Sequence, residues 1–196
     1  MNITKEWLKT HDSCSDGMDW FVAQNETDGV KLAEKLMAED RFGWANWLIV
    51  RIMTRPQYLS YAIFSAEQVI GIYEAQYPND FQPRKAIEAA RRVLDNDSAE
   101  NRAAAWSAWS AAGDAGFAAR TAEAATWAAW AAAGAAASAA GDAWFAAWSA
   151  WSVARTAGFS AWATGFSARA TARDAGDAMQ RRIIDHGLML IGRLET

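Results

Sequence analysis

Cysteine and histidine are scarce in this sequence of 196 residues. It contains one cysteine, Cys14, and two histidines, His11 and His186. One cysteine excludes a disulfide within the chain. The histidines lie near opposite ends, and His11 with Cys14 forms an H-x-x-C pattern without the second ligand pair that a zinc site needs. We therefore expect no metal site, no cofactor and no enzymatic activity.

An excess of basic residues is also missing. Residues 1–98 carry 11 Lys and Arg against 15 Asp and Glu, residues 99–196 carry 8 of each, and the formal net charge is −4. This balance excludes the electrostatic footprint of a general nucleic-acid-binding protein.

Long apolar segments are absent as well. The opening sequence MNITKEWLKTHD has no basic and apolar signal pattern, so we expect a cytoplasmic protein. Residues 124–141 are uncharged but consist mostly of Ala, Gly, Ser and Thr, which argues against a membrane span.

The first half of the sequence predicts short helices separated by turn residues. Thr54 is a candidate N-cap with Pro56 in the first turn of its helix, Pro78 and Pro83 interrupt helical structure, and Ser98 is placed to cap the next helix. The expected helices cover residues 4–11, 15–24, 28–38, 42–53, 55–77 and 84–94.

The second half is dominated by alanine, which makes up 36 of the 80 residues from Ala99 to Ala178 and favours helices strongly. Tryptophans recur there in a heptad register. Positions a hold Trp106, Trp127, Trp148 and Trp162, and positions d hold Trp109, Trp130, Trp144 and Trp151. The tryptophans therefore fall on one helical stripe, opposite a face of alanine methyl groups.

Pairs of glycine and aspartate stand at whole-heptad intervals, at residues 113–114, 141–142 and 176–177. We interpret each pair as the end of one helix and the cap of the next. The predicted fold is all-α, with an amino-terminal helical region (1–97) packed on an alanine- and tryptophan-rich array of antiparallel helical hairpins (98–196). The array is solenoid-like or a bundle, and the two regions alternatively form one continuous domain.

The tryptophan stripe has two interpretations. The first is that the indoles fill the core between helices, as apolar stripes usually do. The second is that indoles and guanidinium groups line a groove that binds a ligand or a partner. The candidate binding residues are Trp106, Trp109, Arg120, Trp127, Trp130, Trp144, Trp148, Trp151, Arg155, Trp162 and Arg169.

Three runs carry a family resemblance: WANWLIVRIM (44–53), YAIFSAEQVIGIYEAQYPND (61–80) and QPRKAIEAARRVL (82–94), followed by the alanine-rich half. Together they resemble an alanine-rich, all-helical family of immunity proteins of bacterial toxin systems, also carried by phages and prophages. The most specific residues are Pro83, Arg84, Ala86, Ile87, Glu88, Ala89 and Ala90. The resemblance implies a helical, non-catalytic binding protein.

Three hypotheses about function follow. The leading one is an inhibitor or immunity-like protein that sequesters a protein partner, a toxin or a host defence factor, in phage–bacterium or interbacterial conflict. The second is a phage counter-defence protein that sequesters a small nucleotide signal. Tryptophans would stack on the base, and Arg120, Arg155 or Arg169 would lie near the phosphates. The third is a helical array that assembles with copies of itself.

Overall fold

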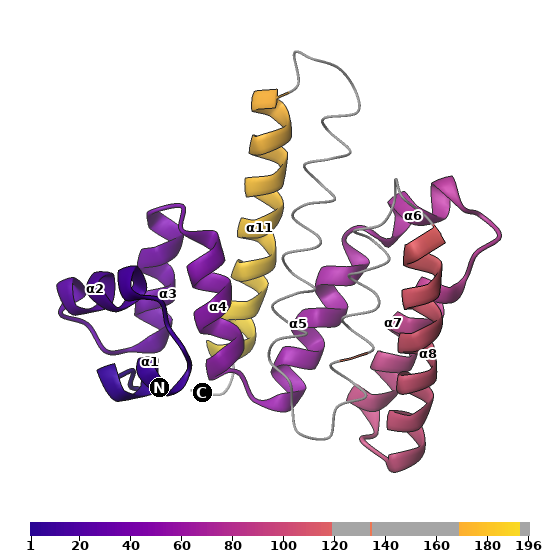
Figure 1. The fold of residues 1–196 in the computed structure, drawn as a ribbon, viewed down its shortest axis with the longest axis horizontal. Helices are drawn as coiled ribbons and strands as arrows, with labels where there is room; N and C mark the ends of the chain where they lie inside the picture. Colours follow the sequence, from indigo (N-terminus) through magenta and orange to yellow (C-terminus); the bar gives the residue numbers. More distant parts are fainter. Residues whose placement is uncertain (119–133, 135–168, 193–196) are drawn as a thin grey trace.

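The computed structural model describes residues 1–118, 134 and 169–192, and these residues form helices joined by short turns (Figure 1). The described helices are α1 (Lys5–Thr10), α2 (Ser15–Gln24), α3 (Gly29–Ala38), α4 (Phe42–Ile52), α5 (Arg55–Glu67), α6 (Ile70–Gln76), α7 (Gln82–Asp95), α8 (Ala99–Ala118) and α11 (Arg169–Gly192). The described part of the chain has no strand, only an isolated bridge between Asn2 and Asp28. The all-α prediction is confirmed.

Three groups of helices follow one another across the molecule (Figure 1). Helices α1–α4 form one end, α5 and α11 lie in the middle, and α6, α7 and α8 form the other end. α11 packs against both α4 and α5, and α7 packs between α5 and α8. Residues 169–192 therefore share a core with the amino-terminal half.

Local signals explain several helix starts. The side chain of Gln57 accepts a hydrogen bond from the backbone N–H of Thr54 at 2.8 Å, which completes a capping box at the start of α5. Ser98 Oγ accepts from the backbone N–H of Asn101 at 3.1 Å at the start of α8. The N-caps predicted at Thr54 and Ser98 are confirmed.

The helix expected over residues 55–77 is in fact two helices, because the chain turns at Gln68 and Val69 between α5 and α6. The N–H groups of these two residues bond to carbonyl groups three residues earlier, at 3.2 Å. The break costs little, since Val69, Ile70 and Gly71 have weak helix propensity. It places Val69 and Ile70 in the core.

Two of the glycine–aspartate pairs do not end helices. α8 continues through Gly113 and Asp114, and α11 continues through Gly176 and Asp177, so the prediction of breaks at these positions is wrong. One interior glycine costs about 1 kcal/mol, which the surrounding alanines and the packing of a long helix outweigh. The pair at 141–142 and the predicted array around it lie outside the described residues.

The core at the centre of the molecule is built around Tyr61 of α5, which is fully buried. Its hydroxyl donates to Asn46 Oδ1 at 2.7 Å, and burial raises the pKa of this phenol far above its ordinary value. Gly187 of α11 allows side chains of α4 and α5 to pack directly against the backbone of α11. A Cβ at this glycine would lie 2.7 Å from Ile49 Cδ1 and 2.9 Å from Tyr61 Cε2.

We predict that Gly187→Ala destabilises the protein by up to about 2 kcal/mol. Overpacking costs about 1–3 kcal/mol and exceeds the roughly 1 kcal/mol by which alanine favours a helix. Urea denaturation measures the change. Gly71→Ala in α6 is the matched control, because a Cβ there meets nothing within 4 Å, and it should leave stability equal or raise it. Equal effects of the two substitutions would contradict the close approach.

Candidate functional site

Few of the predicted binding residues fall in the described part of the chain. Trp106 and Trp109 lie on α8, and Arg169 begins α11, although its side chain is not described. The other candidates lie outside the described residues: Arg120, Trp127, Trp130, Trp144, Trp148, Trp151, Arg155 and Trp162. The predicted groove of indoles and guanidinium groups therefore stays a prediction, and so does the nucleotide-binding hypothesis.

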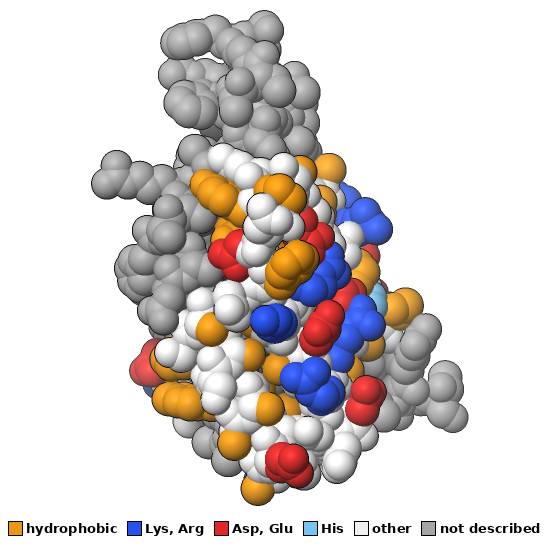
Figure 2. Space-filling model, turned by 90° about the vertical axis from the view of Figure 1, so that its right-hand side faces the viewer, with side chains coloured by type: hydrophobic (Ala, Val, Ile, Leu, Met, Phe, Trp, Pro, Cys, Tyr) orange, Lys and Arg blue, Asp and Glu red, His pale blue; other side chains and the backbone are white. Residues whose placement is uncertain are grey.

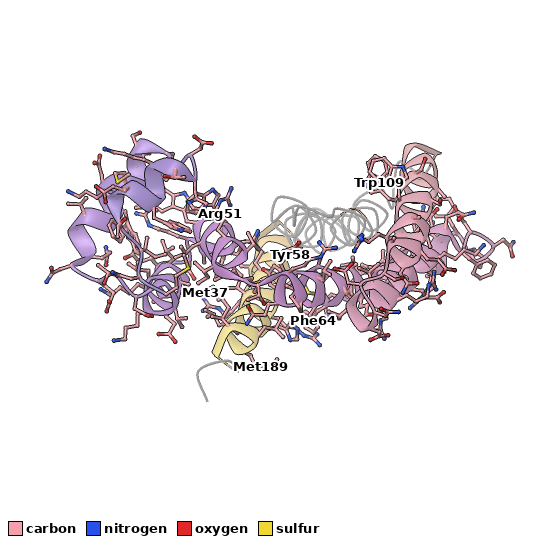
Figure 3. The ribbon with its side chains drawn as sticks, turned by 90° about the horizontal axis from the view of Figure 1, so that it is seen from below. Met37, Arg51, Tyr58, Phe64, Trp109 and Met189 are labelled. Carbon is pink, nitrogen blue, oxygen red and sulfur yellow. The ribbon has the colours of Figure 1, made fainter. Side chains whose placement is uncertain are left out.

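Trp106 and Trp109 form a pair on α8. Their ring centroids are 4.6 Å apart, and the ring planes are inclined by 30°. Trp109 is half-buried and packs against the hydrophobic core, whereas 58% of Trp106 is exposed. Figure 3 marks the position of Trp109 on α8, at the end of the molecule opposite α1–α3. Trp109 thus fits the interpretation of the stripe as core, and Trp106 fits its interpretation as an exposed binding surface.

Besides Trp109, several neighbours of Trp106 on its helix have small side chains. Ala103, Ser107 and Ser110 are one helical turn or one residue away and are exposed. Ser107 Oγ donates to the backbone carbonyl of Ala103 at 3.2 Å, so this hydroxyl is turned to its own helix. Among the residues of α8 whose exposure the structure describes, Trp106 is the one large apolar side chain that is exposed.

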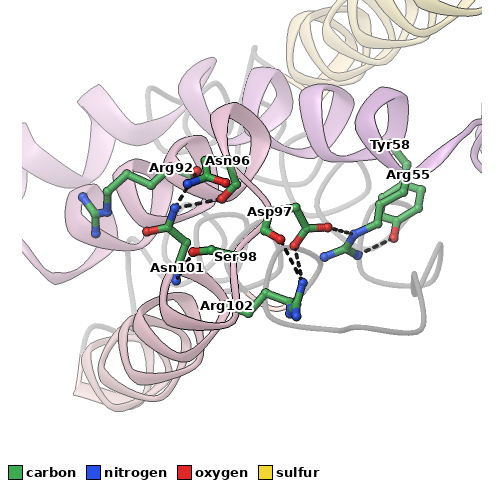
Figure 4. Close-up of polar contacts among 8 residues, drawn as sticks. All are labelled: Arg55, Tyr58, Arg92, Asn96, Asp97, Ser98, Asn101 and Arg102. Carbon is green, nitrogen blue, oxygen red and sulfur yellow. Dashed lines mark hydrogen bonds and ion pairs between the residues drawn. The ribbon is translucent and has the colours of Figure 1, made fainter.

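The start of α8 is held to α5 through Asp97 (Figure 4). The Asp97 carboxylate accepts from Arg55 Nε at 2.9 Å and from Arg102 Nη1 at 2.7 Å. Arg55 also donates to the hydroxyl of Tyr58 at 2.8 Å. Hydrogen bonds from Arg55 and Arg102 lower the pKa of Asp97 below its ordinary value.

The turn between α7 and α8 is closed by Asn101 (Figure 4). Its side-chain amide donates to the carbonyl of Asn96 at 2.8 Å and to that of Arg92 at 3.2 Å. The sequence predicted a helix end at residue 94 and a cap at Ser98, but not the roles of Asn101 and Arg55. The acidic residues next to Ser98 were the available signal in the sequence. The partner of Asp97 on α5, Arg55, depends on tertiary packing.

Charged side chains of both signs lie next to one another on the outer face of the molecule (Figure 2). Arg84 forms two hydrogen bonds of 2.6 Å with the Glu74 carboxylate, and Arg91 pairs with Glu67. The Arg84 guanidinium lowers the pKa of Glu74. These pairs link α7 to α5 and α6, and they leave no surface of a single sign among the residues named here.

Possible metal-ligating side chains are not clustered in the described ranges. No three His, Cys, Asp or Glu side chains there are placed to hold a metal ion. His11 Nδ1 lies 2.7 Å from the carbonyl of Trp7, and His186 stacks on Phe64 with centroids 3.8 Å apart. None of the helices in these ranges combines the length and the apolarity that a membrane span requires.

Comparison of the chain with family models, with curated proteins and with solved structures finds no match.

We predict that Asp97→Asn lowers stability at neutral pH by about 0.5–1 kcal/mol, the range for partly exposed ion pairs. The folded-state pKa of Asp97 is depressed, so its contribution is present above the ordinary value of 3.8 and is lost as the pH falls through the folded-state pKa. The difference between the two proteins should therefore disappear in acid. Urea denaturation at neutral and acidic pH measures it.

Asp95→Asn provides the control for this experiment. Asp95 is exposed at the end of α7, two residues from Asp97, and a neutral side chain is slightly favoured at the carboxyl end of a helix. The control should keep or slightly gain stability at neutral pH. A difference between Asp97→Asn and the unmodified protein that persists unchanged in acid would contradict the role of the carboxylate.

Proposed function

We propose that this protein is a non-catalytic binding protein that neutralises a protein partner by holding it against α8. The observation that carries the proposal is the exposure of Trp106, of which 58% is accessible although its ring lies against Trp109. Tryptophan is among the residues that contribute most to protein–protein interfaces, because its large apolar surface becomes buried there.

The structure around Trp106 suits a recognition surface. Asp97, Arg55 and Asn101 hold the start of α8 against its neighbours, so the helix needs little ordering when a partner binds. The small side chains of Ala103, Ser107 and Ser110 leave room beside the indole for the partner's own side chains. Helix packing depends on such combinations of large and small residues.

The inhibitor or immunity-like role rests on the sequence resemblance. In its most specific run, Pro83, Ala86, Ile87, Ala89 and Ala90 are buried. Packing thus explains these five residues of the run, and we assign the choice of partner to other surfaces such as α8. The partner we propose is a toxin or a host defence factor in phage–bacterium or interbacterial conflict.

The test compares the unmodified full chain with Trp106→Ala in a pull-down from bacterial lysate. We expect one protein retained in stoichiometric amount by the unmodified chain, and a loss of affinity of about 30-fold or more for Trp106→Ala, as for other interface hot spots. Val22→Ala is the control, because Val22 lies on α2 and is 50% exposed. It should retain the partner.

Two results would contradict the proposal. One is that the unmodified chain retains no stoichiometric protein, and the other is that Trp106→Ala retains the partner as well as Val22→Ala does. Far-UV circular dichroism of both variants distinguishes a lost contact from a lost fold. An exposed side chain among small neighbours should leave the helical signal unchanged.

A further inference from the structure

Helices α1–α4, at the opposite end of the molecule from α8, surround an open cavity of about 290 Å³. Its walls come from all four helices and from the turn that joins α1 to α2. Figure 3 shows these helices together on one side of α11. The proposed binding of a partner by α8 makes no use of this cavity.

Three tryptophans line the cavity: Trp20 of α2, with Trp44 and Trp47 of α4. Trp20 and Trp44 meet edge to face, with ring centroids 6.5 Å apart. Most of the remaining wall is formed by leucine, isoleucine and phenylalanine side chains. The cavity is therefore apolar and rich in aromatic surface, as ligand pockets usually are.

The three indoles are held in place by neighbouring polar groups. Trp20 Nε1 donates to Glu39 at 2.8 Å, which satisfies the indole N–H. The Arg41 guanidinium lies 4.5 Å from the ring centroid of Trp44. The Arg51 guanidinium similarly lies 4.1 Å from the ring centroid of Trp47. Such cation–π contacts fix the ring orientations before any ligand is present.

One polar group in the cavity wall has no partner. Ser13 Oγ is buried, and no described residue forms a hydrogen bond with it. The backbone holds this serine in place, because Asp12 adopts a left-handed conformation with φ of 53° and the Ser13 N–H donates to the carbonyl of Leu8 at 3.0 Å. A buried hydroxyl without a partner costs free energy, so such groups are uncommon in native structures.

We propose that this cavity binds a neutral aromatic molecule of about two fused rings that carries one hydroxyl group. The indole walls favour an aromatic ligand over an aliphatic one of the same size. The ligand's hydroxyl pairs with Ser13 Oγ and completes its hydrogen bonding. A charged ligand would lose its hydration against apolar walls, and Asp12, the one carboxylate among the lining residues, disfavours an anion.

The volume of the cavity determines how many aromatic rings the proposed ligand has. An apolar cavity of about 150 Å³ is large enough to bind benzene. The present cavity, at about 290 Å³, is roughly twice that size. Two fused rings with a hydroxyl group therefore fill it, whereas a single ring leaves much of the aromatic wall uncovered.

The test measures the affinity of the full chain for 2-naphthol, naphthalene and 2-naphthoate by equilibrium dialysis at neutral pH. We expect 2-naphthol to bind about three- to tenfold more tightly than naphthalene, the effect of one net hydrogen bond. The anion 2-naphthoate should bind more weakly than 2-naphthol.

Ser13→Ala should remove the preference for 2-naphthol over naphthalene while leaving the affinity for naphthalene unchanged. The substitution deletes a hydroxyl that has no partner, so the protein should remain folded with equal or slightly higher stability. Ser110→Ala is the matched control, because Ser110 is exposed on α8, and it should keep the preference.

The reactivity of Cys14 reports where the ligand binds. Cys14 is the only cysteine of the sequence, is exposed, and lies among the cavity-lining residues. Saturating 2-naphthol should slow its modification by a thiol reagent severalfold. The proposal is overturned if 2-naphthol does not bind, if Ser13→Ala keeps the preference, if 2-naphthoate binds more tightly, or if bound 2-naphthol leaves Cys14 reactivity unchanged.

Discussion

The packing of α11 against α4 and α5 is the constraint on which the rest of the described structure depends. Gly187 makes this packing possible, since Ile49 and Tyr61 occupy the space that a side chain would need. Ile183 and Ile184 of α11 are buried in the same core, and Gln57 Nε2 donates to the carbonyl of Leu190 at 2.7 Å. A helix more than a hundred residues away in sequence thus closes the core of the amino-terminal half.

Two surfaces of different chemistry lie at opposite ends of this central core. At one end, α7 and α8 pack together and contain alanines with no exposed surface, including Ala86, Ala90 and Ala105, and Trp106 of α8 is exposed. At the other end, α1–α4 enclose an aromatic cavity with an unpartnered serine hydroxyl. The core formed by α4, α5 and α11 lies between the two ends, so each of these surfaces is built from its own set of helices.

The sequence predicted helix starts well, because a cap is a local interaction between residues three apart, as at Thr54 and Ser98. It predicted the breaks between helices less well. The turn at Val69 and the uninterrupted path of α8 through Gly113 both depend on what the helix packs against. Propensity differences of about 1 kcal/mol are too small to decide such cases by themselves.

By itself the sequence determined the all-α class, the places where many helices begin, and the common stripe of Trp106 and Trp109. Only the tertiary structure decided that Trp109 packs against the core while Trp106 stays exposed. Periodicity shows which residues share a helix face, but the extent of the neighbouring helices determines how much of that face is covered. Only the tertiary structure likewise decided the cavity beside Ser13, because its walls come from four helices whose arrangement no local sequence pattern encodes.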